Sequence, residues 1–157
     1  MRFSTLLTTA TATAATALTG GFANQKSIDT WYRTLDKPGY VPPDAVFPIA
    51  WTALYADIAA TAADALDRLD GAERRRYVTA LGVNLVLNAG WSWLFFGWRR
   101  LGLSALAAAV LAASSADLAR RTARVSRRSG VALVPYPAWC TFATVMSADI
   151  WRRNRDR

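Results

Sequence analysis

Apolar residues in this chain are gathered in five runs that short polar segments separate. The runs cover residues 3–23, 46–66, 77–97, 101–119 and 131–151. Each run has roughly 19–21 residues, close to the number that a helix needs to cross the hydrocarbon core of a bilayer. In lipid every backbone N–H and C=O must be paired within the protein, so each run is expected to form a helix. The pattern predicts an all-α fold, an integral membrane bundle of five transmembrane helices that forms one domain over residues 1–157.

The first run allows a second interpretation. Arg2 precedes it, and small residues lie near its end, between Gly20 and Ala23, as in a secretory signal peptide. Its Thr and Ala composition is also weakly hydrophobic for a spanning helix. The run alone leaves both interpretations open, and the four later runs favour a first helix that is retained in the membrane.

The segment from Trp31 to Tyr55, WYRTLDKPGYVPPDAVFPIAWTALY, joins the first two runs and differs from both. It contains two tryptophans, three tyrosines and four of the six prolines. Proline restricts its own φ and pushes the preceding residue towards extended conformations, so the whole segment cannot be a continuous helix. It is also too apolar for a solvated linker. We therefore expect a compact, partly buried cap loop that leads into the second helix near Val46.

The positive charge of the chain follows the same pattern. Hydrophobic residues make up 53% of the chain, and the net charge of +8 comes from basic residues that lie between or beside the apolar runs. This arrangement indicates a lipid bilayer as the partner and no nucleic acid, because no nucleic-acid-binding motif accompanies the arginines. Ten basic residues fall on one side of the predicted membrane and nine on the other. The positive-inside rule therefore leaves the orientation open.

The composition removes several kinds of chemistry. Cys140 is the single cysteine, so no intrachain disulfide can form and no thiol pair can bind a metal. The chain has no histidine, which removes the usual imidazole base, the commonest metal ligand and the axial histidine of haem proteins. We expect no metal site and no required cofactor.

Three of the runs carry a stripe with aromatic residues at its centre, at the helical spacing of about 100° per residue. The stripes are Trp51, Tyr55 and Ile58; Asn84, Asn88, Trp91 and Phe95; and Tyr136, Trp139, Ala143 and Met146. Such stripes often pack in a core, and an Asn can simply bond to a neighbouring membrane helix. Polar groups in membrane segments also tend to face a cavity, and Ala143 beside Trp139 leaves room for a flat ligand. The spacing fits both a packed core and a binding cavity.

The acidic residues fall into two groups. Asp64, Asp117 and Asp149 each have an arginine three or four positions on and are expected to form interfacial ion pairs. Asp57 lies near the middle of the second run without a basic residue one turn away, on the same side as Ala53 and Ala60. Because a carboxylate that faces lipid is costly, we expect this side of the helix to contact protein or a second subunit.

Three motifs resemble the signature of the tryptophan-rich sensory protein/translocator protein family (TspO/MBR), which includes the peripheral-type benzodiazepine receptor. The cap segment matches at Trp31, Tyr32, Leu35, Lys37, Pro38, Pro42, Pro43, Phe47, Trp51, Thr52, Leu54 and Tyr55. The second motif is NAGWSWLFFG, from Asn88, and the third is VPYPAWCTFAT, from Val134. The motifs occur in the expected order and cover essentially the whole chain.

The resemblance implies a five-helix bundle, commonly a homodimer, whose cap loop closes a ligand cavity. Family members bind tetrapyrroles such as protoporphyrin IX and haem, and animal members bind sterols. The implied ligand contacts are Tyr32, Pro42, Trp51, Asn88, Trp91, Trp139 and Ala143, and the stripes add Tyr55, Asn84 and Tyr136. Some bacterial relatives promote light-dependent breakdown of bound porphyrin, a reaction in which Trp51 and Trp139 would be the catalytic residues.

The resulting hypothesis is a membrane receptor or stress sensor for tetrapyrroles and similar flat hydrophobic ligands. The alternatives are a light-dependent porphyrin-degrading enzyme and a transporter of porphyrins or other amphiphiles. The Ala- and Arg-rich composition suggests a bacterial source and hence the plasma membrane. Two departures from the family pattern stand out: Gly39 and Tyr40 replace an aromatic pair in the cap, and no Tyr lies between Val145 and Arg152. The second departure argues against high-affinity sterol binding.

Overall fold

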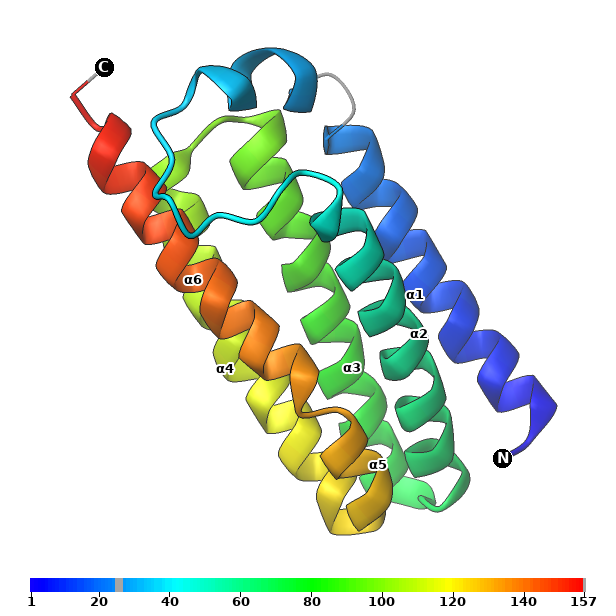
Figure 1. Ribbon diagram of the computed structural model, residues 1–157. Coiled ribbons are helices and arrows are strands. Elements are labelled where there is room, and N and C mark those ends of the chain that lie inside the picture. Colours follow the sequence, from blue (N-terminus) through cyan, green and yellow to red (C-terminus); the bar gives the residue numbers. More distant parts are fainter. Residues whose placement is uncertain (25–26, 157) are drawn as a thin grey trace.

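The computed structural model describes residues 1–24 and 27–156, and residues 25, 26 and 157 of the predicted domain lie outside this part. The described part is all-helical (Figure 1). Its α-helices are α1 (Phe3–Asn24), α2 (Val46–Asp67), α3 (Gly71–Ser92), α4 (Leu101–Val125), α5 (Arg127–Ala132) and α6 (Pro135–Asn154). Two short π-helical segments, η1 (Ile28–Tyr32) and η2 (Trp93–Gly97), lie in the cap and at the end of α3.

The long helices run alternately up and down through one bundle (Figure 1). α1 packs against both α2 and α3, α4 packs against α3, and α6 packs along α4. α2 and α6 make only slight contact, although both border the cap. The cap between α1 and α2 covers the end of the bundle at which α3 and α6 finish (Figure 1).

Four helical segments in the described part are long and apolar enough to cross a membrane, as judged by length and composition. They are Val46–Asp67, Gly71–Gly97, Leu101–Val125 and Arg127–Asn154. α1 also has sufficient length, with 22 residues. It is absent from this group because its threonines lower its mean hydropathy. The structure thus shows a helical bundle with four candidate spans.

The helix boundaries differ from the predicted ones at the start of α3 and between α4 and α6. α3 begins at Gly71 rather than at residue 77, because the arginine-rich turn before Tyr77 is already helical. The predicted single helix over 131–151 is wrong, because α5 ends at Ala132 and α6 begins at Pro135. A proline in a helix interior removes one backbone donor and its ring clashes with the preceding turn, so the two prolines in the first turn of α6 end the earlier helix.

The polar segment between the predicted runs 101–119 and 131–151 is also largely helical, since α4 continues to Val125 and α5 starts at Arg127. α5 folds back on α4 at a very close approach. A Cβ added to Gly130 would lie 2.4 Å from the Ala123 Cα, so only glycine fits at this position. The side chain of Ser126 caps α5 by accepting a hydrogen bond from the Ser129 backbone N–H.

The buried apolar residues form two clusters that meet along α3. The larger one surrounds Ile58, Leu118 and Tyr136 in the half of the bundle away from the cap. The smaller one contains Tyr32, Trp91, Phe95, Ala108, Met146 and Ile150 and lies under the cap. Because the cap contributes Tyr32 to this second cluster, the cap loop is partly buried, as the sequence predicts.

The acidic residues largely behave as predicted. Asp64 pairs with Arg68 at 3.0 Å, Asp117 with both Arg120 and Arg121, and Asp149 with Arg152 at 3.0 Å. Asp57 is half-buried on the outer side of α2. Its carbonyl accepts a hydrogen bond from the Thr61 hydroxyl at 2.7 Å, but its carboxylate has no hydrogen bond or ion pair with another residue of the described part.

Candidate functional site

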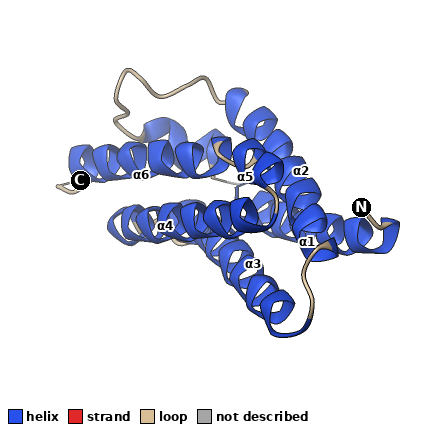
Figure 2. Ribbon diagram, turned by 90° about the horizontal axis from the view of Figure 1, so that it is seen from below, coloured by secondary structure: helices blue, strands red, loops and turns tan. Residues whose placement is uncertain are grey.

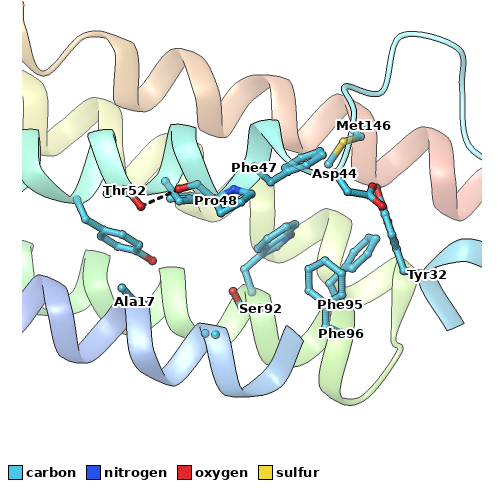
Figure 3. A pocket seen from close by; sticks show the side chains of 15 residues that line it. Ala17, Tyr32, Asp44, Phe47, Pro48, Thr52, Ser92, Phe95, Phe96 and Met146 are labelled. Carbon is cyan, nitrogen blue, oxygen red and sulfur yellow. Dashed lines mark hydrogen bonds between the residues drawn. The ribbon is translucent and has the colours of Figure 1, made fainter. Parts of the chain in front are cut away.

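A cavity of about 410 Å³ lies under the cap, between α1, α2 and the end of α3 (Figure 3). This volume falls within the range of roughly 300–1,000 Å³ that is typical of small-molecule sites. The residues that line it are Ala17, Gly20, Gly21, Tyr32, Asp44, Phe47, Pro48, Trp51, Thr52, Tyr55, Trp91, Ser92, Phe95, Phe96 and Met146. The lining is therefore mostly aromatic and apolar, with a few polar groups.

The α2 wall of the cavity is built from two aromatic rings. Trp51 and Tyr55 are four positions apart, so they project from the same side of α2, one turn from each other. Their ring centroids are 5.5 Å apart, with the planes tilted by 31°. Behind them, Trp139 from α6 meets the Trp51 ring edge-on at 6.5 Å. Packing from behind fixes the orientation of the Trp51 ring at the cavity surface.

The α3 wall continues this aromatic surface. Trp91 and Phe95 stack with their centroids 5.5 Å apart and their planes at 28°. The wider turn of η2 then brings Phe95 and Phe96 together at 4.8 Å, and both reach the ring of Tyr32 in the cap, at 6.0 and 5.6 Å. The ring of Tyr32 is thus held against η2 by an edge-to-face contact with Phe95 and a tilted contact with Phe96.

The α1 wall is made of small residues. A Cβ added to Gly20 would lie 3.0 Å from Ser92 Oγ, so this glycine allows α1 to approach α3 closely. A Cβ on Gly21 would meet nothing within 4 Å. Gly21 borders empty space, and the cavity owes part of its volume to the missing side chain. Figure 3 shows Ala17 and Ser92 across the cavity from Thr52 and Pro48.

The cap side of the cavity carries two polar groups, Tyr32 and Asp44, which lie next to each other in Figure 3. Burial of Tyr32, and secondarily the nearby Asp44 carboxylate, raise the pKa of the Tyr32 hydroxyl to about 12. This hydroxyl is therefore a neutral hydrogen-bond donor at physiological pH. The ammonium group of Lys37 lies 4.2 Å from the centre of the Tyr32 ring and donates to the Tyr32 carbonyl at 3.1 Å.

The cap is fastened to the last turn of α6 by polar contacts. The amide of Asn154 accepts a hydrogen bond from the Asp36 backbone N–H at 3.0 Å and donates one to the Asp36 carbonyl at 2.9 Å. The Tyr40 hydroxyl donates to Asp149 at 2.7 Å. Desolvation, followed by the bond to the Asp149 carboxylate, raises the pKa of Tyr40. These contacts hold the cap across the end of the bundle.

The two amides of α3 lie below the cavity in a continuous chain of hydrogen bonds. The Tyr55 hydroxyl donates to Asn88 Oδ1 at 2.6 Å, and Asn88 Nδ2 donates to the Tyr136 hydroxyl at 3.1 Å. The Tyr136 hydroxyl donates to Asn84 Oδ1 at 2.8 Å, and Asn84 Nδ2 donates to Ser114 at 3.1 Å. The chain ties α2, α3, α4 and α6 together. Each amide has both of its functions engaged by protein groups.

One residue that lines the cavity has a buried polar atom without a partner. Trp91 is buried, and its Nε1–H makes no hydrogen bond within the described part of the chain. An unpaired buried donor costs free energy on the order of 1–3 kcal/mol. A ligand acceptor would recover part of that cost once a small turn of the indole ring brought this atom to the cavity surface.

The structure brings only some of the predicted site residues to the cavity. Tyr32, Trp51, Tyr55 and Trp91 line it. Asn84, Asn88 and Tyr136 belong instead to the hydrogen-bond chain beneath it. The remaining three predicted residues do not line the cavity: Trp139 supports Trp51 from behind, Ala143 is buried on α6, and Pro42 is half-buried in the cap.

Several cavity residues are not singled out by the sequence. The largest group is the α1 wall of Ala17, Gly20 and Gly21. The Gly20–Gly21 pair is visible in the sequence, but it fits the end of a signal peptide equally well. Met146 does lie on a predicted stripe, and Phe47 and Phe96 lie in the motifs, without a signal that distinguishes them from packing residues.

Comparisons with known proteins agree with this architecture. The pattern described as the TspO/MBR family matches residues 8–152. The chain is 31% identical over 157 residues to the tryptophan-rich sensory protein of Cereibacter sphaeroides, covering 100% of this chain and 96% of that protein. It is 33% identical over 129 residues to the protein CrtK of Rhodobacter capsulatus, covering 79% and 78%. It is also 30% identical over 145 residues to the translocator protein of Ovis aries, covering 88% and 85%.

Proposed function

The chain belongs to the TspO/MBR family of membrane sensory and translocator proteins, and on that premise we propose that it is a receptor for tetrapyrroles such as protoporphyrin IX or haem. The aromatic lining of the cavity under the cap carries this proposal. Trp51 and Tyr55 form one wall, and Trp91 and Phe95 form another. A flat conjugated macrocycle between such walls gains apolar burial and ring contacts at once.

The polar groups of the cavity suggest how the macrocycle is oriented. Trp91 Nε1 and the neutral Tyr32 hydroxyl are donors, whereas Asp44 carries a negative charge on the cap side. A propionate or carbonyl group of the ligand is therefore expected near Trp91 and away from Asp44. Asn88 is not available to the ligand while it bonds to Tyr55 and Tyr136. In this proposal the ligand occupies the cavity, and the occupied state signals stress or the supply of tetrapyrroles.

Titration of the purified protein with protoporphyrin IX tests the proposal. The Soret band of the porphyrin should shift on binding, and Trp91→Phe should weaken the affinity about tenfold because the pyrrole part of the indole and its N–H donor are lost. Trp98→Phe is the matched control, since Trp98 is exposed outside the cavity. Absence of a Soret shift with both protoporphyrin IX and haem, or an equal effect of the two substitutions, would contradict the proposal.

We also propose that α1 is a fifth transmembrane helix. Its threonine hydroxyls are bonded within the helix, as in the bond from Thr16 to the Ala12 carbonyl at 3.0 Å, so their cost in lipid is reduced. Thr9 in addition donates to the Ala59 carbonyl of α2 at 2.9 Å. A helix that packs on α2 and α3 and contributes a cavity wall favours a retained span over a cleaved signal peptide. The bacterial relatives make the plasma membrane the expected location.

A homodimer that uses the Asp57 side of α2 is part of the same proposal. Asp57 lies between the exposed residues Ala53 and Ala60 on one side of α2, and its carboxylate has no polar partner in the described part of the chain. A second copy could supply a hydrogen bond to this carboxyl group and close packing to the alanines. Asp57→Leu should shift the protein towards monomers in detergent, whereas Thr52→Leu, on the exposed cap end of α2, should not. An unchanged oligomeric state in Asp57→Leu would exclude this interface.

One observation favours a second function, light-dependent breakdown of the bound porphyrin. Trp51 lines the cavity and its ring lies 6.5 Å from that of Trp139, so an oxidising equivalent formed at Trp51 could pass to Trp139. Such a reaction would consume dioxygen and light and open the macrocycle. Linear tetrapyrrole products should then form under illumination with the wild type but not with Trp51→Phe or Trp139→Phe. Equal bleaching without the protein would exclude this activity.

A further inference from the structure

A second hollow lies between α3 and α4, at the end of the bundle away from the cap. Its volume is about 580 Å³, and it is bordered by Arg75, Arg76 and Val83 from α3 and by Ser114, Asp117 and Arg121 from α4. Figure 2 shows the first turns of α3 diverging from α4 at this end. The hollow is therefore a groove on the outside of the bundle, and none of its residues takes part in the cavity under the cap.

The arginines that border this groove on the two helices lie within about one turn of the same level. On α3 the arginines end at Arg76, and on α4 the first charged residue is Asp117. Two contacts fix the register of the helices: the Tyr77 hydroxyl lies 2.8 Å from the Thr122 hydroxyl, and Asn84 bonds to Ser114 at 3.1 Å. The arginines of the groove thus lie where a membrane-spanning bundle leaves the hydrocarbon core and enters the headgroup region.

The charges at this level leave an excess of positive charge. Arg76 is paired with Glu73 at 2.9 Å. Asp117 accepts from Arg120 at 2.6 Å and from Arg121 Nε at 2.5 Å, so a single carboxylate is shared by two guanidinium groups. The guanidinium group of Arg75 has no hydrogen bond or ion pair with another described residue. Asp117 holds the Arg121 guanidinium in place through Nε, and the terminal nitrogens of Arg121 stay available to a ligand.

From the arginines towards the cap end of the bundle, the groove is bordered mainly by apolar residues. Val83 is 52% exposed, and helical spacing continues the same side of the two helices to Val86, 72% exposed, and Val110, 46% exposed. From Arg75 to Val86 the helix rises about 16 Å, at about 1.5 Å per residue. That length matches one leaflet, half of a hydrocarbon core of about 30 Å. The groove therefore has a charged mouth at the headgroup level and an apolar track as long as an acyl chain.

We propose that this groove binds an anionic phospholipid, with its phosphate between Arg75 and Arg121 and one acyl chain along Val83 and Val86. Arginine binds phosphate oxygens with two parallel hydrogen bonds, and basic pockets between membrane helices favour anionic headgroups. A zwitterionic lipid gains less, because its own cationic group meets the same arginines. The bound lipid would fill the gap between the diverging ends of α3 and α4.

Native mass spectrometry of the protein in mild detergent tests the charge requirement. The protein should retain phosphatidylglycerol in preference to phosphatidylcholine of the same chains. Arg75→Gln and Arg121→Gln should each reduce that retention about fivefold, as expected for one arginine at an anionic headgroup. Arg100→Gln is the matched control, since Arg100 is an exposed arginine at the other end of α4. Equal retention of the two lipids, or equal effects of all three substitutions, would overturn the proposal.

A second variant tests the acyl track without changing the charge. Val83→Trp fills the groove and should reduce retention of phosphatidylglycerol several-fold, whereas Val78→Trp, which is 49% exposed on another side of α3, should not. Glycerol phosphate should compete poorly with the intact lipid; if it competes equally, the groove is only an anion site and the proposal fails. Both valines are exposed, so these variants remain informative if Arg121→Gln does not fold. Porphyrin affinity should be unchanged in all of them, which separates this site from the proposed receptor site.

Discussion

Two neighbouring segments of α3 differ in whether their buried polar groups have hydrogen-bond partners. Around Asn88 every amide function is engaged, and four helices are tied together by one chain of hydrogen bonds. One turn further, Trp91 lines the cavity, and its buried Nε1–H has no partner in the described part of the chain. The part of this stripe around Asn88 thus forms a hydrogen-bonded floor beneath the cavity, and the part at Trp91 forms one of the cavity walls. The difference indicates that the hydrogen bonds of the floor offset the free energy of folding that is lost at the unfilled cavity.

Substitution at the floor should have the largest effect on stability. Asn88→Ala removes two hydrogen bonds and leaves the hydroxyls of Tyr55 and Tyr136 without those partners. We expect a loss of about 2 kcal/mol in the free energy of unfolding, measured by thermal or denaturant unfolding in detergent. Val86→Ala, on the exposed side of the same helix, should change it by less than about 0.5 kcal/mol. Equal effects would mean that the floor is not the stable half.

Substitution in the α1 wall of the cavity should lower the affinity for the ligand and leave the stability of the fold nearly unchanged. Gly21→Phe places a ring in the cavity, where a Cβ meets no atom within 4 Å. We expect the affinity for protoporphyrin IX to fall at least about tenfold, or about 1.4 kcal/mol, while the melting temperature stays nearly constant. Gly82→Phe is the matched control, because Gly82 is an exposed glycine of α3 whose Cβ also meets nothing. Unchanged affinity in Gly21→Phe would show that the ligand does not use this space.

The cap should control the rate at which a ligand dissociates from the cavity. Asn154→Ala removes the two hydrogen bonds to the Asp36 backbone, so the cap should open more often. We expect the dissociation rate of haem, followed by transfer to a haem-scavenging protein, to rise about fivefold, which corresponds to about 1 kcal/mol. Arg155→Ala, one residue further, keeps the Asn154 bonds and should leave the rate unchanged. A rate that does not respond to Asn154→Ala would show that the cap is not the exit.

The smallest effect should be the pH dependence of fold stability that comes from the titration of the Tyr32 hydroxyl. Burial and the Asp44 carboxylate raise the pKa of this hydroxyl to about 12 from its usual 10.0. Because the folded state holds the proton more tightly than the unfolded state, this term stabilises the fold fully below pH 10 and is lost as the pH rises towards 12. The phenolate absorbance of the wild type minus that of Tyr32→Phe should therefore titrate near pH 12. A difference that titrates near pH 10 would place Tyr32 in solvent.

The sequence predicts the outline of the fold because it is set by long apolar runs and prolines. The runs beginning near Val46 and Leu101 become helices at those residues, since the one proline within them, Pro48, lies in the first turn of α2, where proline is tolerated. The break between α5 and α6 is missed because the apolar run continues through Pro135, and hydropathy does not register a lost backbone donor. Periodicity alone likewise cannot place a helix break within one turn.

The sequence predicts the candidate site less completely, for a different physical reason. Periodicity gives the side of a helix on which Asn88 or Trp91 lies, but not whether a neighbouring helix supplies a partner. Tyr136 provides such a partner for Asn88, and no described residue does so for Trp91. Gly21 is a second example. The space beside it exists because the residue has no side chain, and a glycine in one sequence does not reveal that it lines a cavity. The family motifs identify the aromatic walls, whereas the α1 wall follows only from the three-dimensional structure.

The low hydropathy of α1 has a consequence for the order in which the protein is assembled. A segment with so many threonines partitions weakly into lipid by itself, so it is expected to insert together with α2, as a helical hairpin joined by the bond from Thr9 to the Ala59 carbonyl. Ala17, Gly20 and Gly21 reach their places only when this hairpin docks on α3. The cavity is therefore completed late in biogenesis, and a ligand that fills it would favour the fully assembled bundle over partly inserted forms.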